Sequence, residues 1–358
     1  MSDDDDREPP CPPNKFGITD TALLNRVEAF IASVRSGEIL TGAKSLPARQ
    51  GPERLTAIHR HLFGAVYEHG GRFRTGPSYK ARVVGQAAGT AFTAPARIKA
   101  ELDATFADLR QAKSLRGLNR LDFVDEAAKL LARLNQTHAF EDGNGRTLRV
   151  FMRMTALAAG HDLPFEGITN DRMVEASYRA SHGNLEPLRE LLDEQSDPTR
   201  LPALIRAHHF LQKDWQGLHD FTLATTVPGR HYAGEYLTGE GAHFLLLDRK
   251  AGAVYVGNTA DLDVAPQGKG IEHVSFTARR TGLQAAQHWY DTQERAAQRG
   301  DTHAHLQGAL RKLPANAPNA AQIHAIAADR LKVAARRDAV AQGRLRIVGL
   351  QAPALPSR

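Results

Sequence analysis

The stretch that decides the fold is His138 to Arg149, which reads HAFEDGNGRTLR and lies inside a chain of 358 residues. These twelve residues hold one imidazole, two carboxylates, a Gly-Asn-Gly turn and two arginines. The residues after it are good helix formers with one mostly apolar face, made of Leu148, Phe151, Met152, Thr155 and Ala159. We therefore predict a loop that leads into the first turn of a buried helix.

The turn Gly143, Asn144 and Gly145 predicts an anion-binding site. Glycines free the backbone to turn its amides inward, and a helix N-terminus adds roughly half a positive charge. Arg146 and Arg149 are three residues apart, so both side chains leave one face of the predicted helix. Two guanidinium groups beside a set of amides suit a polyphosphate better than a single carboxylate.

The remaining polar residues of the stretch complete a site for phosphoryl transfer. Asp142 lies beside the turn, and Mg²⁺ prefers one or two carboxylates together with phosphate oxygens. His138 has a side chain that accepts a proton near neutral pH. Each residue alone has an ordinary structural explanation, since Asp142 suits a helix cap and Arg146 and Arg149 a solvated face. Together they supply a base, a metal ligand and a phosphate site.

The stretch resembles the motif of the Fic family, His-x-Phe-x-(Asp/Glu)-Gly-Asn-Gly-Arg-x-x-Arg, and every fixed position is filled. Upstream and downstream segments extend the resemblance over about residues 14–195. It implies an all-helical bundle with one β-hairpin, called the flap. It also implies transfer of AMP from ATP to a Tyr, Thr or Ser hydroxyl of a target protein, with release of pyrophosphate.

By this resemblance, residues of the motif receive roles. His138 is expected to be the general base and Asp142 the Mg²⁺ ligand. The phosphates are expected to contact the turn and the two arginines: Gly143, Asn144, Gly145, Arg146 and Arg149. Transfer of another nucleotide, such as UMP, stays open because the sequence does not define the base-binding pocket.

The resemblance also predicts partners. The flap, residues 76–94, is expected to pair with an extended segment of the target protein, a form of β-augmentation. Many Fic proteins carry an inhibitory Ser/Thr-x-x-x-Glu-Gly/Asn helix, and this string is missing before and after the predicted bundle. We therefore expect inhibition, if it occurs, to come from a separate antitoxin-like chain that places a Glu against Arg149.

Composition describes an ordinary globular chain. Hydrophobic residues make up 42% and charged residues 24%. No apolar run approaches the ~20 residues that span a bilayer. Residues 3–6 are all Asp, where a secretory signal needs positive charge. Cys11 is the one cysteine, which excludes internal disulfides. We expect a cytoplasmic protein, with delivery through a type IV secretion system as an open alternative.

Apolar periodicity and turn residues define the expected elements. Residues 1–13 are acidic and then proline-rich, and are expected to be a disordered tail. A Fic domain is expected over 14–197, with helices at about 20–36, 52–67, 95–115, 122–135, 143–160, 170–182 and 186–192, and a hairpin at 79–92.

Beyond Pro198 the pattern changes to short β-branched segments between Gly-rich turns. After a short helix at 204–213, strands are expected at 222–227, 232–237, 243–247, 254–256, 261–264 and 273–278. They predict a small β domain over 198–278, best explained as an open barrel of the OB kind.

The C-terminal region, 279–358, holds 13 Lys/Arg against 5 Asp/Glu, while the whole chain has a net charge of +6. All of the excess positive charge therefore lies in this region, which we expect to be helical. It could contact nucleic acid or an anionic surface, or serve as a secretion signal. A non-catalytic secretion or nucleic-acid-binding protein with a Fic fold is the alternative to the enzyme. The layout resembles type IV secretion effectors and Fic toxins.

Overall fold

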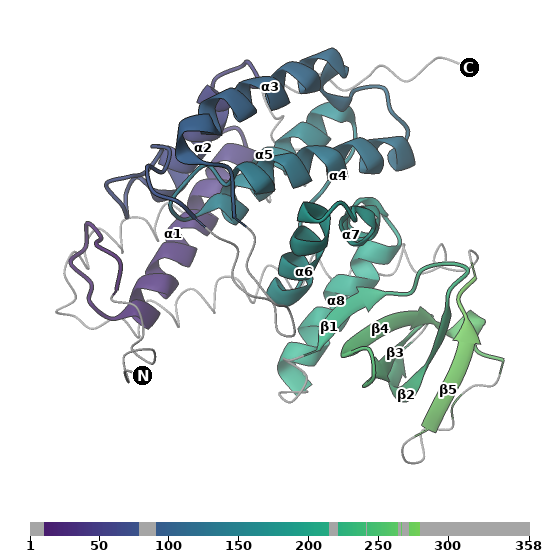
Figure 1. Cartoon of the computed structure of the whole chain (residues 1–358). Helices are drawn as coiled ribbons and strands as arrows, with labels where there is room; N and C mark the ends of the chain where they lie inside the picture. The colour runs from purple at the N-terminus through teal and green to yellow at the C-terminus, as the bar shows by residue number, and fades with distance from the viewer. Residues whose placement is uncertain are drawn as a thin grey trace, which may run out of the picture.

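The computed structural model describes residues 11–78, 91–214, 221–240, 242–263, 266 and 272–279. A helical bundle occupies most of this length, and a small sheet follows it (Figure 1). The bundle elements are α1 (Thr21–Leu40), α2 (Pro52–Phe63), η1 (Pro95–Arg97), α3 (Ile98–Gln111), η2 (Lys113–Leu115), α4 (Arg120–Thr137), α5 (Asn144–Ala159), α6 (Asn170–Ser181) and α7 (Glu186–Ser196).

Side-chain caps set where several helices begin. The carboxylate of Asp20 accepts the Leu23 N–H at 2.9 Å at the start of α1, and Asn119 accepts two amides at the start of α4. Each cap satisfies an amide that has no partner inside the helix. The predicted helices at 20–36 and 122–135 are therefore confirmed, although α1 continues to Leu40.

Two predicted helices end differently from the expectation. The helix predicted to reach Tyr67 stops at Phe63, because the chain turns there so that Gly64 and Gly70 pack backbone against backbone. The helix predicted over 95–115 is split into η1, α3 and η2. Lys113, Ser114 and Leu115 adopt positive φ values of 50–63°, which no α-helix accommodates.

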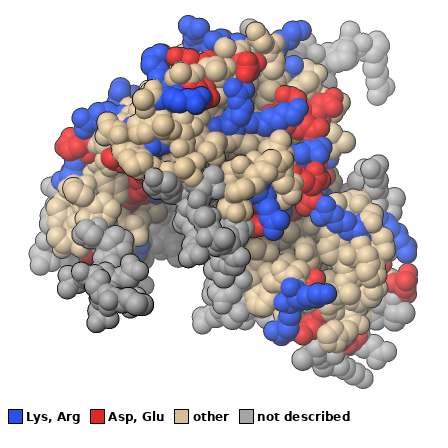
Figure 2. All heavy atoms as spheres, in the orientation of Figure 1, with Lys and Arg blue, Asp and Glu red and all other residues tan. Residues whose placement is uncertain are grey.

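One apolar core holds the bundle together. It includes Phe106 and Phe151, which meet edge to face with ring centroids 5.5 Å apart, and Met152 on the buried side of α5. Basic and acidic side chains are interspersed over the outer surface in Figure 2. No helix in the part of the chain that the structure describes combines the length and the apolar character of a membrane span.

The sheet follows α8 (Arg200–Asp214) and has five strands in the order β1-β4-β3-β2-β5. Their bounds are β1 (Thr222–Thr225), β2 (His231–Glu240), β3 (His243–Asp248), β4 (Ala253–Asn258) and β5 (Glu272–Thr277). β1 runs parallel to β4, and the other pairs are antiparallel. α8 covers one face with Ala203, Leu204 and Ala207.

The small β domain is confirmed as a mixed sheet, whereas its OB-like identity stays a prediction. The strand predicted at 261–264 is wrong for its described residues. Thr259–Asp261 instead form a 3₁₀ turn, because the Asn258 side chain accepts the Ala260 N–H at 2.9 Å and bends the chain. The predicted disordered tail up to residue 10, the flap over 79–90 and the C-terminal helices lie outside the described residues.

Buried charges join the sheet to the bundle. Glu194 of α7 is fully buried, pairs with Arg172 of α6, and accepts both the N–H and the hydroxyl of Thr225 at 2.6 and 2.7 Å. Arg200 donates to the same hydroxyl at 2.8 Å and to Asp193 at 2.6 Å. Because these contacts are buried, water cannot easily replace them. They therefore fix the sheet to α6 and α7.

Candidate active site

His138 caps the C-terminus of α4 with φ 44° and ψ 60°, a left-handed conformation that is uncommon for a residue with a side chain. Its imidazole stacks on Phe92, with ring centroids 3.7 Å apart and an angle of 8° between the planes. Arg74 donates to its carbonyl oxygen at 2.6 Å. These contacts fix both the backbone and the ring of the predicted base.

Asn144 closes the loop that follows. Its side chain accepts the Phe140 N–H at 2.9 Å and donates to the Phe140 carbonyl at 2.7 Å. The residue is buried, and it opens α5. Both polar atoms of its side chain are therefore engaged inside the loop, where they hold Phe140.

His59 of α2 contacts the same loop from its buried side. Its Nδ1 accepts the Gly71 N–H at 2.8 Å, so its Nε2 carries the proton and donates to the Asp142 carbonyl at 2.9 Å. The ring is fully buried and stacks on Phe140 at 3.9 Å. Burial lowers the pKa of His59 from 6.5 to about 4, which keeps this ring neutral.

Gly143 is the residue that the turn requires. Its φ is +73°, and a Cβ on it would lie 2.3 Å from the ring of Phe63. That ring cannot retreat, because it is 1% exposed and Arg146 covers it with its guanidinium carbon 4.9 Å from the centroid. Both conformation and space therefore exclude a side chain at this position.

Arg146 points away from the cavity described below and forms an ion pair with Glu28 of α1. Glu28 is 3% exposed and also accepts the hydroxyl of Tyr67. Burial and then this carboxylate raise the pKa of Tyr67. The first motif arginine thus has its charge compensated inside the fold, a contact that the sequence did not indicate.

Arg149 lies one helical turn further along α5 and lines a cavity of about 440 Å³ with His138 and Gly145. Among the described residues it has no ion pair. Partial burial, followed by the like charge of Arg146, lowers the pKa of Arg149, although a guanidinium stays protonated near neutral pH. The rest of the cavity is mostly apolar and includes Phe165, Ile168 and Met173.

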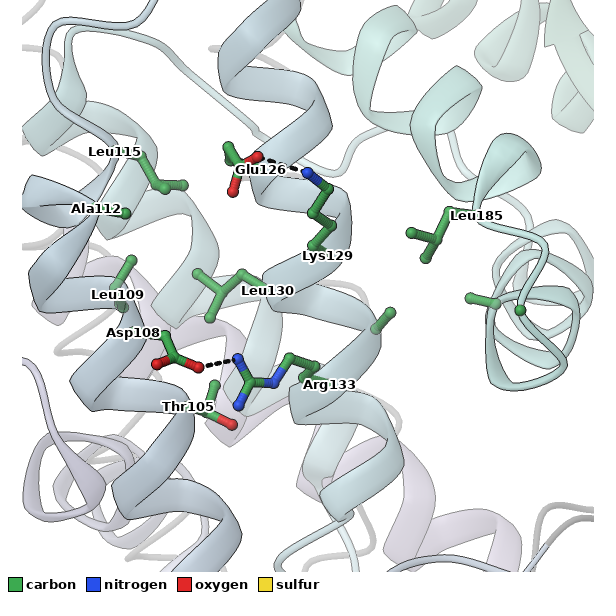
Figure 3. A pocket seen from close by; sticks show the side chains of 13 residues that line it. Thr105, Asp108, Leu109, Ala112, Leu115, Glu126, Lys129, Leu130, Arg133 and Leu185 are labelled. Atoms are coloured by element: carbon green, nitrogen blue, oxygen red, sulfur yellow. Dashed lines mark hydrogen bonds and ion pairs between the residues drawn. The ribbon is translucent and has the colours of Figure 1, made fainter.

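A second cavity of about 440 Å³ lies between α3 and α4 (Figure 3). Its cations are already paired, Arg133 with Asp108 at 2.6 Å and Lys129 with Glu126 at 2.6 Å. Apart from Thr105, the rest of its lining is apolar or glycine, and none of the lining residues is a histidine. The cavity beside His138 is therefore the candidate active site, since it alone of the two combines an imidazole, an unpaired cation and a helix N-terminus.

The predicted residues divide into two groups. His138, Gly145 and Arg149 line the cavity, and Asp142 is exposed beside it. Gly143 and Asn144 are buried in the loop, and Arg146 faces α1. Sequence reasoning missed three supporting residues, Glu28, His59 and Arg74. Each of them has one partner in or beside the motif that lies more than 60 positions further along the chain, and no local pattern marks such a pair.

Residues 51–156 match the family model described as Fic/DOC family. The chain is 32% identical over 255 residues to "Protein adenylyltransferase" of Bartonella henselae, a match that covers 68% of this chain and 46% of that protein. The chain thus spans less than half of that relative's length. It is also 31% identical to "Probable protein adenylyltransferase y4lH" of Sinorhizobium fredii, over 49% of this chain and 85% of that protein.

Among solved structures, the chain is similar to "Type IV secretion system effector protein BepA". The TM-score is 0.63 and the identity 29%, over 75% of this chain and 94% of that chain. The likeness therefore covers far more of the chain than the family-model segment, residues 51–156. The motif, the geometry around it and these relatives agree, and the chain belongs to the Fic/DOC family.

Proposed function

We propose that the protein transfers AMP from ATP to a hydroxyl group of a target protein. The observation that carries the proposal is the cavity in which His138, Gly145 and Arg149 meet at the N-terminus of α5. The adenylyltransferase names of the relatives support the same reaction. The target hydroxyl loses its proton to His138 and forms a bond to the α-phosphorus. The bond from the α-phosphorus to the bridging oxygen breaks, and pyrophosphate leaves.

We assign the phosphates to the first turn of α5. The exposed backbone at Gly145 and the half-positive helix end favour an anion, and Arg149 adds a full positive charge that is not paired within the described residues. Arg146 stays in the proposal as a weaker contributor, because Glu28 already compensates its charge. Asn144 and Gly143 contribute through the shape of the loop and its amides.

Asp142 is the candidate Mg²⁺ ligand. The residue is exposed, its Oδ1 accepts the Gly143 N–H at 2.5 Å, and its Oδ2 has no hydrogen-bond partner among the described residues. One free carboxylate oxygen beside a phosphate site fits Mg²⁺, which takes most of its ligands from phosphates and water. When bound, the ion would neutralise phosphate charge as pyrophosphate leaves.

The two ends of the segment 76–94 support its proposed role in docking the target. The Phe92 N–H donates to the Ser78 carbonyl at 3.1 Å, so the ends lie side by side, and Phe92 contacts the ring of His138. A target strand that pairs with this segment would bring its hydroxyl near the base. A separate antitoxin-like chain that places a Glu against Arg149 is the proposed inhibitor.

We also propose the division into a tail at 1–13, a Fic domain at 14–197, a β domain of the OB kind at 198–278 and a basic region at 279–358. The three-stranded meander β2-β3-β4, with β1 and β5 added at its two edges, supports a partly open barrel. The likeness to BepA supports delivery through a type IV secretion system. The basic region is proposed to act in that delivery or in binding an anionic surface.

The test is incubation of the full chain with a cell lysate and ATP labelled at the α-phosphate. We expect label on protein with the wild type and a loss of about 100-fold or more with His138→Ala, as for removal of a general base. ATP labelled at the γ-phosphate should leave protein unlabelled. Equal labelling by both proteins would refute the proposal, and mass spectrometry of the product distinguishes AMP from UMP.

A further inference from the structure

Arg74 joins three parts of the molecule that meet at His138. The side chain donates to four backbone carbonyls, those of Gly76, Thr93, Thr137 and His138. Its own N–H donates to the Ala139 carbonyl at 2.9 Å. Gly76 and Thr93 stand at the two ends of the segment that begins and returns beside α4, so a single guanidinium holds both ends and the capping residue.

The burial of this side chain argues for a specific role. Arg74 is 4% exposed, and no carboxylate among the described residues pairs with it. Burial lowers its pKa accordingly. A buried cation without a counter-ion is costly, and here only carbonyl dipoles compensate it. A residue that served packing alone could be apolar, so the planar set of donors explains why an arginine is present.

His138 needs support of this kind. Its left-handed backbone is sterically disfavoured for a residue with a Cβ. Its ring is oriented by the stack on Phe92, the residue immediately before Thr93. Arg74 holds the carbonyls of His138 and of Thr93, which are the backbone groups next to the two stacked rings.

We propose that Arg74 is a positioning residue that sets the orientation of the His138 imidazole against Phe92 and against the two ends of segment 76–94. The inference rests on the proposed function and deepens it. Arg74 contacts no residue that lines the phosphate end of the cavity. Its loss therefore lowers the rate of transfer from bound ATP to the target hydroxyl and leaves the binding of nucleotide unchanged.

The test compares the wild type with Arg74→Lys, which keeps the charge and loses the planar donors. We expect the transfer rate at saturating ATP to fall about 10- to 100-fold, as for a misplaced catalytic group. Affinity for a non-hydrolysable ATP analogue should stay at the wild-type value. Guanidinium ion, at concentrations that leave the protein folded, should restore part of the activity of Arg74→Ala.

A second readout needs no activity. In proton spectra of the folded protein, the ring protons of His138, assigned by their absence in His138→Gln, should be shifted upfield by the stacked Phe92. In Arg74→Lys this shift should diminish. Arg200→Lys is the matched control, because Arg200 is an equally buried arginine at the junction of bundle and sheet, and it should lower thermal stability without changing the transfer rate.

The inference is overturned if Arg74→Lys transfers at the wild-type rate, or if its ring shift is unchanged. It is also overturned if nucleotide affinity falls together with transfer, or if Arg200→Lys loses as much transfer as Arg74→Lys. A wild type that labels no protein would instead refute the proposed function, and the ring shift would still decide the role of Arg74.

Discussion

The two sides of the loop between His138 and Arg149 meet different surroundings. On the inner side Gly143, Asn144 and Arg146 contact Phe63, Phe140 and Glu28, all of them buried. On the outer side Asp142, Gly145 and Arg149 are exposed at or beside the cavity. Of these six motif residues, the three on the inner side therefore stabilise the loop, and the three on the outer side are placed to contact a ligand. Substitutions on the inner side should lower the free energy of unfolding, and substitutions on the outer side should lower AMP transfer.

The two arginines give the sharpest separation. Arg149→Met should lower AMP transfer about 100- to 1,000-fold, as for loss of one preorganised charge donor, with unfolding unchanged. Arg146→Met should lower the free energy of unfolding by about 3–5 kcal/mol, because it leaves the carboxylate of Glu28 buried and unpaired. AMP-transfer assays measure the first effect and urea unfolding measures the second, and both are applied to both variants. Comparable losses of stability in the two variants would contradict the division.

The glycine on the inner side should tolerate no side chain. Gly143→Ala forces a left-handed alanine against the buried ring of Phe63, at a cost of about 2–4 kcal/mol. Urea unfolding monitored by circular dichroism measures the loss. A variant as stable as the wild type would mean that Phe63 can move, and the inner side would then be less rigid than its contacts indicate.

His59 should make the inner side sensitive to acid. Its pKa is about 4 in the folded protein and 6.5 in the unfolded chain, so below 6.5 the unfolded chain binds the proton first. The contribution of His59 to stability is thus lost as the pH falls from 6.5 to 4, by about 3 kcal/mol in total. Unfolding of the wild type and His59→Gln at several pH values isolates this contribution. Parallel pH profiles would disprove it.

The glycine on the outer side should give the smallest effect on folding. A Cβ at Gly145 meets nothing within 4 Å, and its backbone is helical, so Gly145→Ala should raise stability by up to about 1 kcal/mol. The methyl group would nevertheless stand at the edge of the cavity and lower affinity for an ATP analogue. Calorimetric titration measures the affinity. Tighter binding by Gly145→Ala would contradict the assignment of Gly145 to the phosphate site.

Local patterns were enough to predict most helices and the loop. Apolar spacing along α5 and the cap at Asp20 act within a few residues, so the sequence displays them directly. The cap at Asn119 was not predicted, and the helix expected from 122 begins at Arg120. The division of Arg146 from Arg149 could not be predicted in this way. Their spacing indicates one helical face, but Glu28, 118 positions upstream, decides where the first one points. The irregular backbone of Lys113 to Leu115 left no local pattern either.

Glu194 has a consequence for cutting the chain. Its carboxylate is satisfied partly by Thr225 of β1, across the boundary where the bundle would be separated from the sheet. A fragment that ends at residue 197 would keep Glu194 and its ion pair with Arg172 but lose both donors that Thr225 supplies to the buried carboxylate. Bundle and sheet should consequently melt as one cooperative unit, and the shortest fragment as stable as the full chain should extend well past the family-model segment.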